Sequence, residues 1–293
     1  MRVAITGATG LIGSNLASNL QKESLFLTSQ SGGTSDAGVV KAMDLTNFEK
    51  TLSWLDETKP NLVFHTAAIS SVDLAELHKT QAEKLNVDCT KTIGKWCSKN
   101  NARLIYFSSD FVFDGISLDY NEKDMPKPLS WYGETKWKSE NELQSILEDL
   151  VIIRPILVYG SDKMLSRQNF VTMVIDRLSN GTQMNITSDQ FRMPTYVEDL
   201  ADAAIKIAYG AYKGIIHISG DEKIGVFDFA LAVTDVFDLD PCLLKPVTTS
   251  SMNQIGQRPL KSGFDLTLVK SLINYEPHSV REGLTALRNN TMM

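Results

Sequence analysis

The stretch GATGLIG, residues 7–13, places Gly7, Gly10 and Gly13 in a G-x-x-G-x-x-G spacing directly after the apolar run RVAIT at residues 2–6. A buried strand, a glycine turn and a helix, in that order, form the phosphate-binding element of doubly wound proteins. Gly7 suits the tight turn, Gly10 lets a pyrophosphate approach the backbone, and Gly13 lets the helix lie close to the sheet. A plain strand-to-helix turn is the less favoured interpretation, so the stretch predicts a dinucleotide-binding fold.

The rest of the chain repeats the alternation of strand and helix. Further nearly continuous apolar runs lie at residues 25–29, 61–68, 103–109, 150–155 and 214–220, and segments of helical length separate the first five runs of the chain. This pattern predicts an α/β fold with a doubly wound parallel sheet of the Rossmann type. We expect a Rossmann domain at 1–160 and a smaller, interleaved substrate lobe at 161–293, with about 195–220 returning to the first domain. By composition, residues 29–38 are expected to be flexible.

Composition narrows the function classes. The 293 residues are 43% hydrophobic and carry a net charge of −6, so nucleic-acid binding has little support. No apolar run approaches the ~20 residues of a membrane span, and three cysteines without a C-x-x-C favour a reducing compartment. We therefore expect a soluble cytoplasmic protein. The four histidines are dispersed, so no metal site is predicted.

The choice of dinucleotide should depend on the end of the second predicted strand. Residues 28–31 read TSQS, so Ser29 stands where an Asp or Glu would bind a ribose 2′-hydroxyl. The missing carboxylate favours NADPH over NADH, although no Arg is present there to attract a 2′-phosphate. Asp44, followed by Leu45, is a candidate contact on the adenine side or, equally, an acid near a helix N-cap.

Tyr132 and Lys136 are the candidate catalytic pair. Their Tyr-x-x-x-Lys spacing recurs at Tyr159/Lys163 and Tyr209/Lys213, so spacing alone does not decide. An ammonium four residues away on a helix lies on the same face and lowers the pKa of a phenol, which makes it a better proton donor. Ser108 and Ser109, at the end of a strand predicted to lie in the same sheet as the glycine loop, supply a hydroxyl for a reacting carbonyl. This support is specific to Tyr132.

These residues together resemble an extended short-chain dehydrogenase/reductase over nearly the whole chain. Within that superfamily the chain is similar to dTDP-4-dehydrorhamnose reductases, and the similarity rests on the segments FSSDFVFDG, YNEKDMPKPLSWYGETK, RPILVYG, QNFV and FRMPTYVEDLADA, which begin at residues 107, 120, 154, 168 and 191. Related dehydratases carry an Asp-Glu pair after the catalytic hydroxyl, whereas here Asp110 is followed by Phe111, which argues against dehydration.

The resemblance implies roles for individual residues. Ser109 would bind the C4 carbonyl, Tyr132 would donate the proton, and Lys136 would lower the pKa of the tyrosine and hold the nicotinamide ribose. Asn169 and Arg192 would contact the nucleotide-sugar diphosphate, with a surface ion pair as the alternative for Arg192. Asn86 would brace the active-site strand or be a helix-surface amide. The cofactor-binding set is Gly7, Thr9, Gly10, Leu11, Ile12, Gly13, Ser29, Asp44, Leu45, Ala67, Ala68, Asn86, Ser108, Tyr132, Lys136 and Arg154.

The expected function is an NADPH- or NADH-dependent reductase of a 4-keto-6-deoxy sugar nucleotide, with a homodimer as the candidate assembly. Two departures from the reductases, Ser109 in place of Thr and Leu11 in place of Gln, leave the sugar open. One alternative is a nucleotide-sugar epimerase that retains its NAD. Another is a non-catalytic dinucleotide-binding subunit, like the regulatory subunit of methionine adenosyltransferase, since a fold and its motifs do not require turnover.

Overall fold

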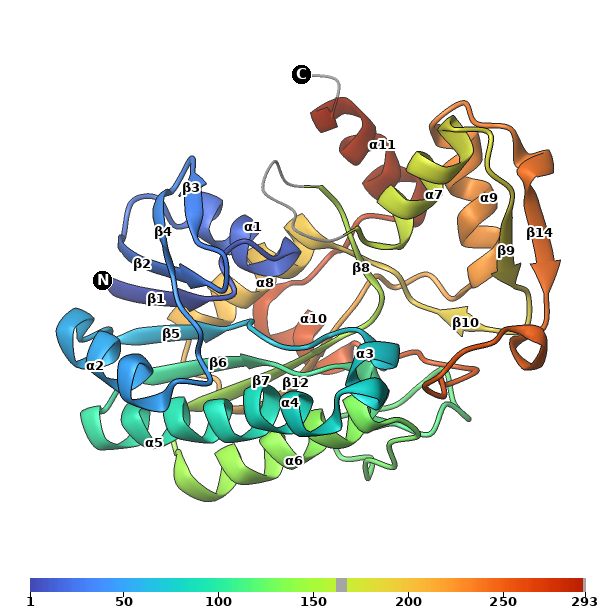
Figure 1. The fold of residues 1–293 in the computed structure, drawn as a ribbon. Coiled ribbons are helices and arrows are strands. Elements are labelled where there is room, and N and C mark those ends of the chain that lie inside the picture. The colour runs from blue at the N-terminus through green and yellow to red at the C-terminus, as the bar shows by residue number, and fades with distance from the viewer. Residues whose placement is uncertain (162–167, 292–293) are drawn as a thin grey trace.

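A computed structural model describes residues 1–161 and 168–291. Its centre is an eight-stranded sheet with the order β12-β7-β6-β5-β1-β2-β4-β3 (Figure 1). The pairs are parallel except β3/β4. The strands are β1 (Arg2–Thr6), β2 (Ser24–Ser29), β3 (Gly33–Ser35), β4 (Gly38–Ala42), β5 (Leu62–His65), β6 (Arg103–Phe107), β7 (Leu150–Pro155) and β12 (Gly214–Ile218). The strand order reverses between β1 and β5, where doubly wound sheets bind their ligands.

Helices cover both faces of this sheet (Figure 1). One face carries α1 (Leu11–Asn19), α8 (Val197–Tyr209) and α10 (Thr267–Ile273), and the other carries α2 (Phe48–Thr58), α4 (Lys79–Glu83), α5 (Thr90–Asn100) and α6 (Trp131–Ile146). Val3 and Ile5 join Leu16 in one buried cluster, whereas Ala4 joins Trp54 in the other, as the alternation of side chains along a strand requires. Burial on both faces explains why the strands read as continuous apolar runs.

A smaller lobe is built mainly from later residues and has its own core. It contains α7 (Phe170–Ser179), α9 (Val226–Val236) and α11 (Val280–Thr291), the parallel pair β9 (Met184–Thr187) and β14 (Leu244–Val247), and the antiparallel pair β10 (Phe191–Arg192) and β13 (Ile224–Gly225). Val174, Phe229, Val233 and Leu284 are fully buried in this core. The parallel pair β8 (Val158–Tyr159) and β11 (Thr195–Tyr196) connects the lobe to the sheet.

The chain passes between the two parts more than once. α8 packs on α1, β12 adds to the edge of the sheet beside β7, and α10 packs on β12 after the chain has left the lobe. The division of the chain into a dinucleotide-binding domain at 1–160 and a mainly substrate-binding lobe at 161–293 stays a prediction. Within the described part of the chain, no helix is both long and apolar enough to cross a membrane.

The predicted α/β fold class is confirmed, and the runs at 2–6, 25–29, 61–68, 103–109 and 150–155 all contain strands of the central sheet. The segment expected to be flexible, 29–38, differs from that expectation because it contains β3, which pairs with β4 as a hairpin. Glycine and serine suit tight turns as well as flexible segments, so composition could not distinguish the two.

Candidate functional site

The glycine loop forms a close-packed cradle at the switch point of the sheet. Gly7 has φ +71°, and a Cβ there would lie 2.8 Å from the backbone nitrogen of Ala67, so the loops after β1 and β5 meet at this point. A Cβ on Gly13 would lie 2.4 Å from the Gly7 carbonyl oxygen. Gly10 is the N-cap of α1, and its amide donates to the Gly7 carbonyl at 2.9 Å. The first-turn amides of α1 therefore face a cradle that only glycines leave open.

The other residues predicted around this loop lie beside it. Thr9 is buried, and Leu11, Ile12, Ala67 and Ala68 are half-buried. Thr66, which the sequence did not single out, donates its hydroxyl to the Thr6 carbonyl at 2.7 Å and joins β5 to β1. Its signal was weak because threonine is common at strand ends.

The residues predicted on the adenine side form turns. The Ser29 hydroxyl accepts from the Gly32 amide at 3.0 Å. The Asp44 carboxylate accepts from the amide and hydroxyl of Thr46 at 2.9 and 2.7 Å, which lowers its pKa, and it stays exposed ahead of α2, whose N-cap is Asn47. Leu45 is buried. Both acceptors thus already have partners within their own turns.

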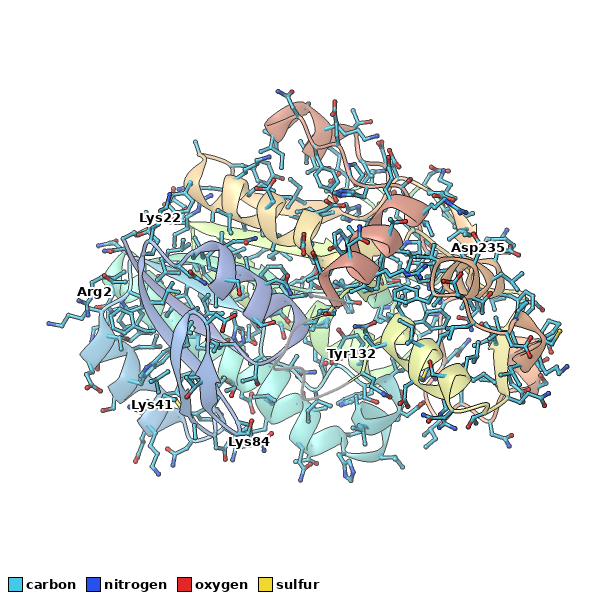
Figure 2. The ribbon with its side chains drawn as sticks, turned by 90° about the horizontal axis from the view of Figure 1, so that it is seen from above. Arg2, Lys22, Lys41, Lys84, Tyr132 and Asp235 are labelled. Atoms are coloured by element: carbon cyan, nitrogen blue, oxygen red, sulfur yellow. The ribbon has the colours of Figure 1, made fainter. Side chains whose placement is uncertain are left out.

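Tyr132 and Lys136 lie one turn apart on α6, which begins at the Ser130 N-cap. Tyr132 is 7% exposed and packs edge-on against Phe111 with ring centroids 5.7 Å apart. Figure 2 shows Tyr132 near the middle of the molecule, whereas Arg2, Lys22, Lys41, Lys84 and Asp235 lie towards its periphery. The Lys136 amine is buried, donates to the Phe107 carbonyl at 2.8 Å and lies 4.8 Å from the centroid of the Tyr106 ring. Burial lowers the pKa of Lys136 to about 7, against an opposing effect of Glu140.

Ser109 lies two residues beyond the carbonyl that Lys136 binds. Its hydroxyl donates to Asp110 at 3.0 Å and accepts from the Phe111 amide at 3.2 Å, which caps a short turn, Asp110–Val112. This turn packs directly on α6, because a Cβ on Gly133 would lie 2.1 Å from the Phe111 carbonyl oxygen. The serine hydroxyl and the Tyr132/Lys136 pair are therefore brought together at the carboxyl end of β6.

Asp110 was noted in the sequence only as part of a motif. It is buried, burial raises the pKa of its carboxyl, and Arg192 opposes that shift. The buried Ser262 hydroxyl also lowers this pKa through its interaction with the carboxyl. These two groups line the junction between the sheet and the smaller lobe, and only long-range folding brings them together.

Tyr159 and Tyr209, the tyrosines of the other two Tyr-x-x-x-Lys pairs, are held by packing and by a hydrogen bond within the fold. Tyr159 is fully buried against Tyr196 and Phe229 in the lobe core, and burial raises its pKa. Its spacing partner Lys163 lies outside the described residues. Tyr209 is half exposed and donates to Glu23 at 2.9 Å; burial, with Glu23, raises its pKa to about 12. Among the pairs that the structure describes, Tyr132 is therefore the tyrosine whose lysine is buried and bonded to the carbonyl at the end of a strand.

Asn86 is buried, so the alternative of a helix-surface amide is wrong. It lies in a π-helical segment, Lys84–Cys89, between α4 and α5. Its side chain bonds both the amide and the carbonyl of Ile69, at 2.9 and 3.2 Å, and donates to the Thr135 hydroxyl at 3.0 Å. π-Helical turns frequently occur at functional sites. Asn86 braces the loop after β5 against the helix that carries Tyr132.

Ser108 and Arg154, predicted as cofactor contacts, have side chains that bond an interior carboxylate. Arg154 is 1% exposed and donates to Glu140 from Nε at 2.9 Å and from Nη2 at 2.5 Å. The Ser108 hydroxyl donates to the same carboxylate. The partner, Glu140, was missed, although its i, i+4 spacing from Lys136 was a readable signal. Both side chains thus have partners inside the protein, and their contact with a cofactor stays a prediction.

Asn169 and Arg192, predicted to bind a diphosphate, have structural partners. Asn169 caps α7: its Oδ1 accepts from the amides of Val171 and Thr172, and its Nδ2 donates to the Gly160 carbonyl at 2.7 Å. Arg192 is buried rather than a surface ion pair, and its guanidinium donates to Gln190 and to the carbonyls of residues 191, 259 and 260. Any contact with substrate would be additional to these bonds.

The geometry fits a nicotinamide dinucleotide. The glycine cradle offers helix N–H groups to a pyrophosphate. At the same carboxyl ends of the parallel strands lie the buried Lys136 amine, the Tyr132 phenol and the Ser109 hydroxyl. Over residues 1–161 and 168–291, no group of three His, Cys, Asp or Glu side chains is arranged to hold a metal ion. The arrangement can transfer a proton to an oxygen that gains negative charge.

Comparisons with known proteins agree with this geometry. The family described as RmlD substrate binding domain matches residues 1–293. A dTDP-4-dehydrorhamnose reductase from Aggregatibacter actinomycetemcomitans is 30% identical over 98% of each chain, and the methionine adenosyltransferase 2 subunit beta from Bos taurus is 31% identical over 92% of this chain and 82% of its own length. The crystal structure of a Bacillus anthracis dTDP-4-dehydrorhamnose reductase in complex with NADP superposes with a TM-score of 0.89 at 25% identity, covering 99% of each chain.

Proposed function

The chain belongs to the RmlD substrate binding domain family, within the extended short-chain dehydrogenases/reductases, and from this premise we propose that it reduces the C4 carbonyl of a 4-keto-6-deoxy sugar nucleotide. Membership confirms the expectation of an NAD(P)-dependent oxidoreductase of this type. The observation that supports the reaction best is the Lys136 amine, buried one turn from Tyr132 and bonded to the strand end beside Ser109.

The catalytic residues act on the carbonyl oxygen of the substrate. A reduced nicotinamide dinucleotide, when bound, supplies the hydride. Ser109 orients the carbonyl, and the Tyr132 hydroxyl donates its proton to the oxygen as negative charge develops on it. The Lys136 ammonium stabilises the resulting phenolate, and a positively charged neighbour one helical turn away lowers the pKa of a phenol. Solvent returns the proton to Tyr132 after product forms.

The dinucleotide would bind at the cradle of Gly7, Gly10 and Gly13, with Ala67 and Ala68 along its border. At the end of β2 the exposed Gln30 and the turn-forming Ser29 present no carboxylate, which favours NADPH over NADH. Thermal stabilisation by each dinucleotide, measured side by side, tests this preference, because a ligand that binds only the folded state raises Tm with its affinity. A larger Tm shift with NADH would reverse the assignment.

The sugar nucleotide would lie between the carboxyl ends of the strands, where Tyr132 and Ser109 meet, and the smaller lobe. Arg192 and Asn169 stand on the lobe side of this junction, and Asp110 stands beside Ser109. The cytoplasmic location and the homodimer stay predictions.

The test supplies NADPH and NADH separately with a panel of 4-keto sugar nucleotides and follows the absorbance of the reduced cofactor. Tyr132→Phe should lower kcat by about 10²–10⁴, the usual contribution of a positioned acid, while dinucleotide affinity stays nearly unchanged. Full turnover in Tyr132→Phe would refute the assignment of the proton donor.

A second candidate is a non-catalytic regulatory subunit, favoured by the 31% identity to methionine adenosyltransferase 2 subunit beta. That function predicts co-purification with a larger enzyme and no oxidation of NADPH by any keto-sugar nucleotide. The retained Ser109, Tyr132 and Lys136, with the lysine buried in place, support the reductase instead.

A further inference from the structure

We propose that Glu140 is a positioning residue of this site: its carboxylate joins the helix of Tyr132 and Lys136 to the ends of β6 and β7 and keeps the Lys136 amine charged. The inference deepens the proposed function and rests on it, because the charge on Lys136 matters for proton donation by Tyr132. The Glu140 carboxylate bonds Ser108 and Arg154 inside the protein, so it acts through its neighbours.

The geometry makes Glu140 the junction of three elements. It lies on α6, one turn after Lys136, and is 1% exposed. Its Oε1 accepts from the Ser108 hydroxyl at 2.5 Å and from Arg154 Nε at 2.9 Å, and its Oε2 accepts from Arg154 Nη2 at 2.5 Å. Ser108 directly precedes Ser109, and Arg154 lies on β7. One carboxylate therefore fixes the catalytic helix relative to the serine that would face the substrate.

The surroundings of Glu140 hold more positive than negative charge. Lys136 and Arg154 are both buried. His217 on β12 is neutral, because its Nδ1 faces the Tyr120 carbonyl at 3.1 Å and must donate, which leaves Nε2 to accept from Arg154 at 3.3 Å. The other titratable groups facing this cluster are His65 on β5, Tyr106 on β6, Tyr132 on α6 and Glu122, which accepts from the His217 amide at 3.1 Å.

Without the Glu140 carboxylate, the Lys136 amine should therefore lose its proton at a lower pH. Burial lowers the pKa of Lys136 to about 7 even though the Glu140 carboxylate opposes this effect. An opposite charge about 4–6 Å away shifts a pKa by about 1–3 units. Without it, most Lys136 side chains would be neutral at pH 7, and a neutral amine does not stabilise a phenolate.

The experiment follows the titration of Lys136 directly, in the intact protein labelled with carbon-13 lysine and without substrate or dinucleotide. The Lys136→Met spectrum assigns its signal. The wild-type midpoint is expected near pH 7, and Glu140→Gln should lower it by about one pH unit or more. The matched control is Glu142→Gln on the same helix, whose carboxylate is 35% exposed and pairs with Lys91; its midpoint should equal that of the wild type.

A second variant guards against loss of folding. Glu140→Gln leaves Arg154 buried without its partner, which is strongly destabilising, whereas the double variant Glu140→Gln/Arg154→Gln removes both charges. The same lowered midpoint is expected in the double variant, and Glu140→Asp, which keeps the charge, should restore the midpoint towards wild type. An unchanged midpoint in whichever of the two Gln variants is folded would overturn the proposal.

The activity readout separates this inference from the proposed reaction. In the NADPH assay, the alkaline fall of kcat/KM should move to lower pH together with the Lys136 midpoint. If no keto-sugar nucleotide is turned over but the midpoint still falls in the Gln variants, the proposed reaction is wrong and the role of Glu140 in holding the charge stands. If turnover is normal and the midpoint does not move, the role of Glu140 is wrong and the reaction stands.

Discussion

Substitution of Gly133 by alanine tests whether catalysis depends on the contact between α6 and the turn after Ser109. A Cβ at Gly133 would lie 2.1 Å from the Phe111 carbonyl oxygen, against 3.4 Å for an ordinary van der Waals contact, so helix and turn must separate by about 1.3 Å. The atom it meets is backbone, which cannot turn aside as a side chain does. A displacement of about 1 Å between reacting groups costs about 10²-fold in rate, or about 2.7 kcal/mol in the barrier.

Gly133→Ala should therefore lower kcat about 100-fold in the NADPH assay. Overpacking costs about 1–3 kcal/mol of stability, so Tm should fall by several degrees while the protein stays folded. Dinucleotide affinity should change less than about twofold, since the glycine cradle is built by other elements.

Gly94→Ala is the matched control for this prediction. It adds the same methyl group on α5, which packs against α6, but its nearest contact, at 2.5 Å, is the end of the Leu143 side chain, which can shift to another rotamer. Turnover should stay near wild type in this control. Wild-type kcat in a folded Gly133→Ala protein would refute the reasoning that this contact positions Tyr132.

Three further predictions use other parts of the structure. Gly13→Ala places a methyl group 2.4 Å from the Gly7 carbonyl and should weaken NADPH binding more than tenfold by titration, whereas Gly210→Ala, with 3.4 Å to its nearest atom, should not; equal affinities would contradict the cradle. Arg192→Ala removes the donor from two buried acceptors, the Pro259 carbonyl and the Gln190 side-chain oxygen, so urea denaturation should show a loss of about 2–4 kcal/mol. KM should rise more than kcat falls; an unchanged KM would remove the substrate role. Burial, with the charge of Lys136, lowers the pKa of His65 from 6.5 to about 3. Below about pH 6.5 the imidazole therefore binds a proton in the unfolded state but stays neutral in the folded state. Stability should then decline by about 1.4 kcal/mol per pH unit from this group, and His65→Asn should flatten the decline measured between about pH 6 and pH 4; parallel curves would exclude it.

Much of the site could be predicted from local sequence because its signals are local. The glycine spacing needs only a strand, a turn and a helix in succession, and the structure brings Gly7, Gly10 and Gly13 together where that order requires. The spacing of Tyr132 and Lys136 follows from the pitch of one helix. Asn169 was predicted for a diphosphate, yet its own neighbours, a threonine three residues later and a helix after it, were a readable capping signal.

The sequence by itself determined the alternation of buried strands and helices, and with it the fold class, because each strand and helix obeys the periodicity of its own backbone. Only the tertiary structure decided that the Lys136 amine is buried and bonded to the Phe107 carbonyl at a strand end, and that the Arg154 side chain pairs with Glu140. Those partners come from different elements, and their contact depends on the order of strands in the sheet. No local pattern encodes that order, since it arises from crossovers that bring distant segments side by side.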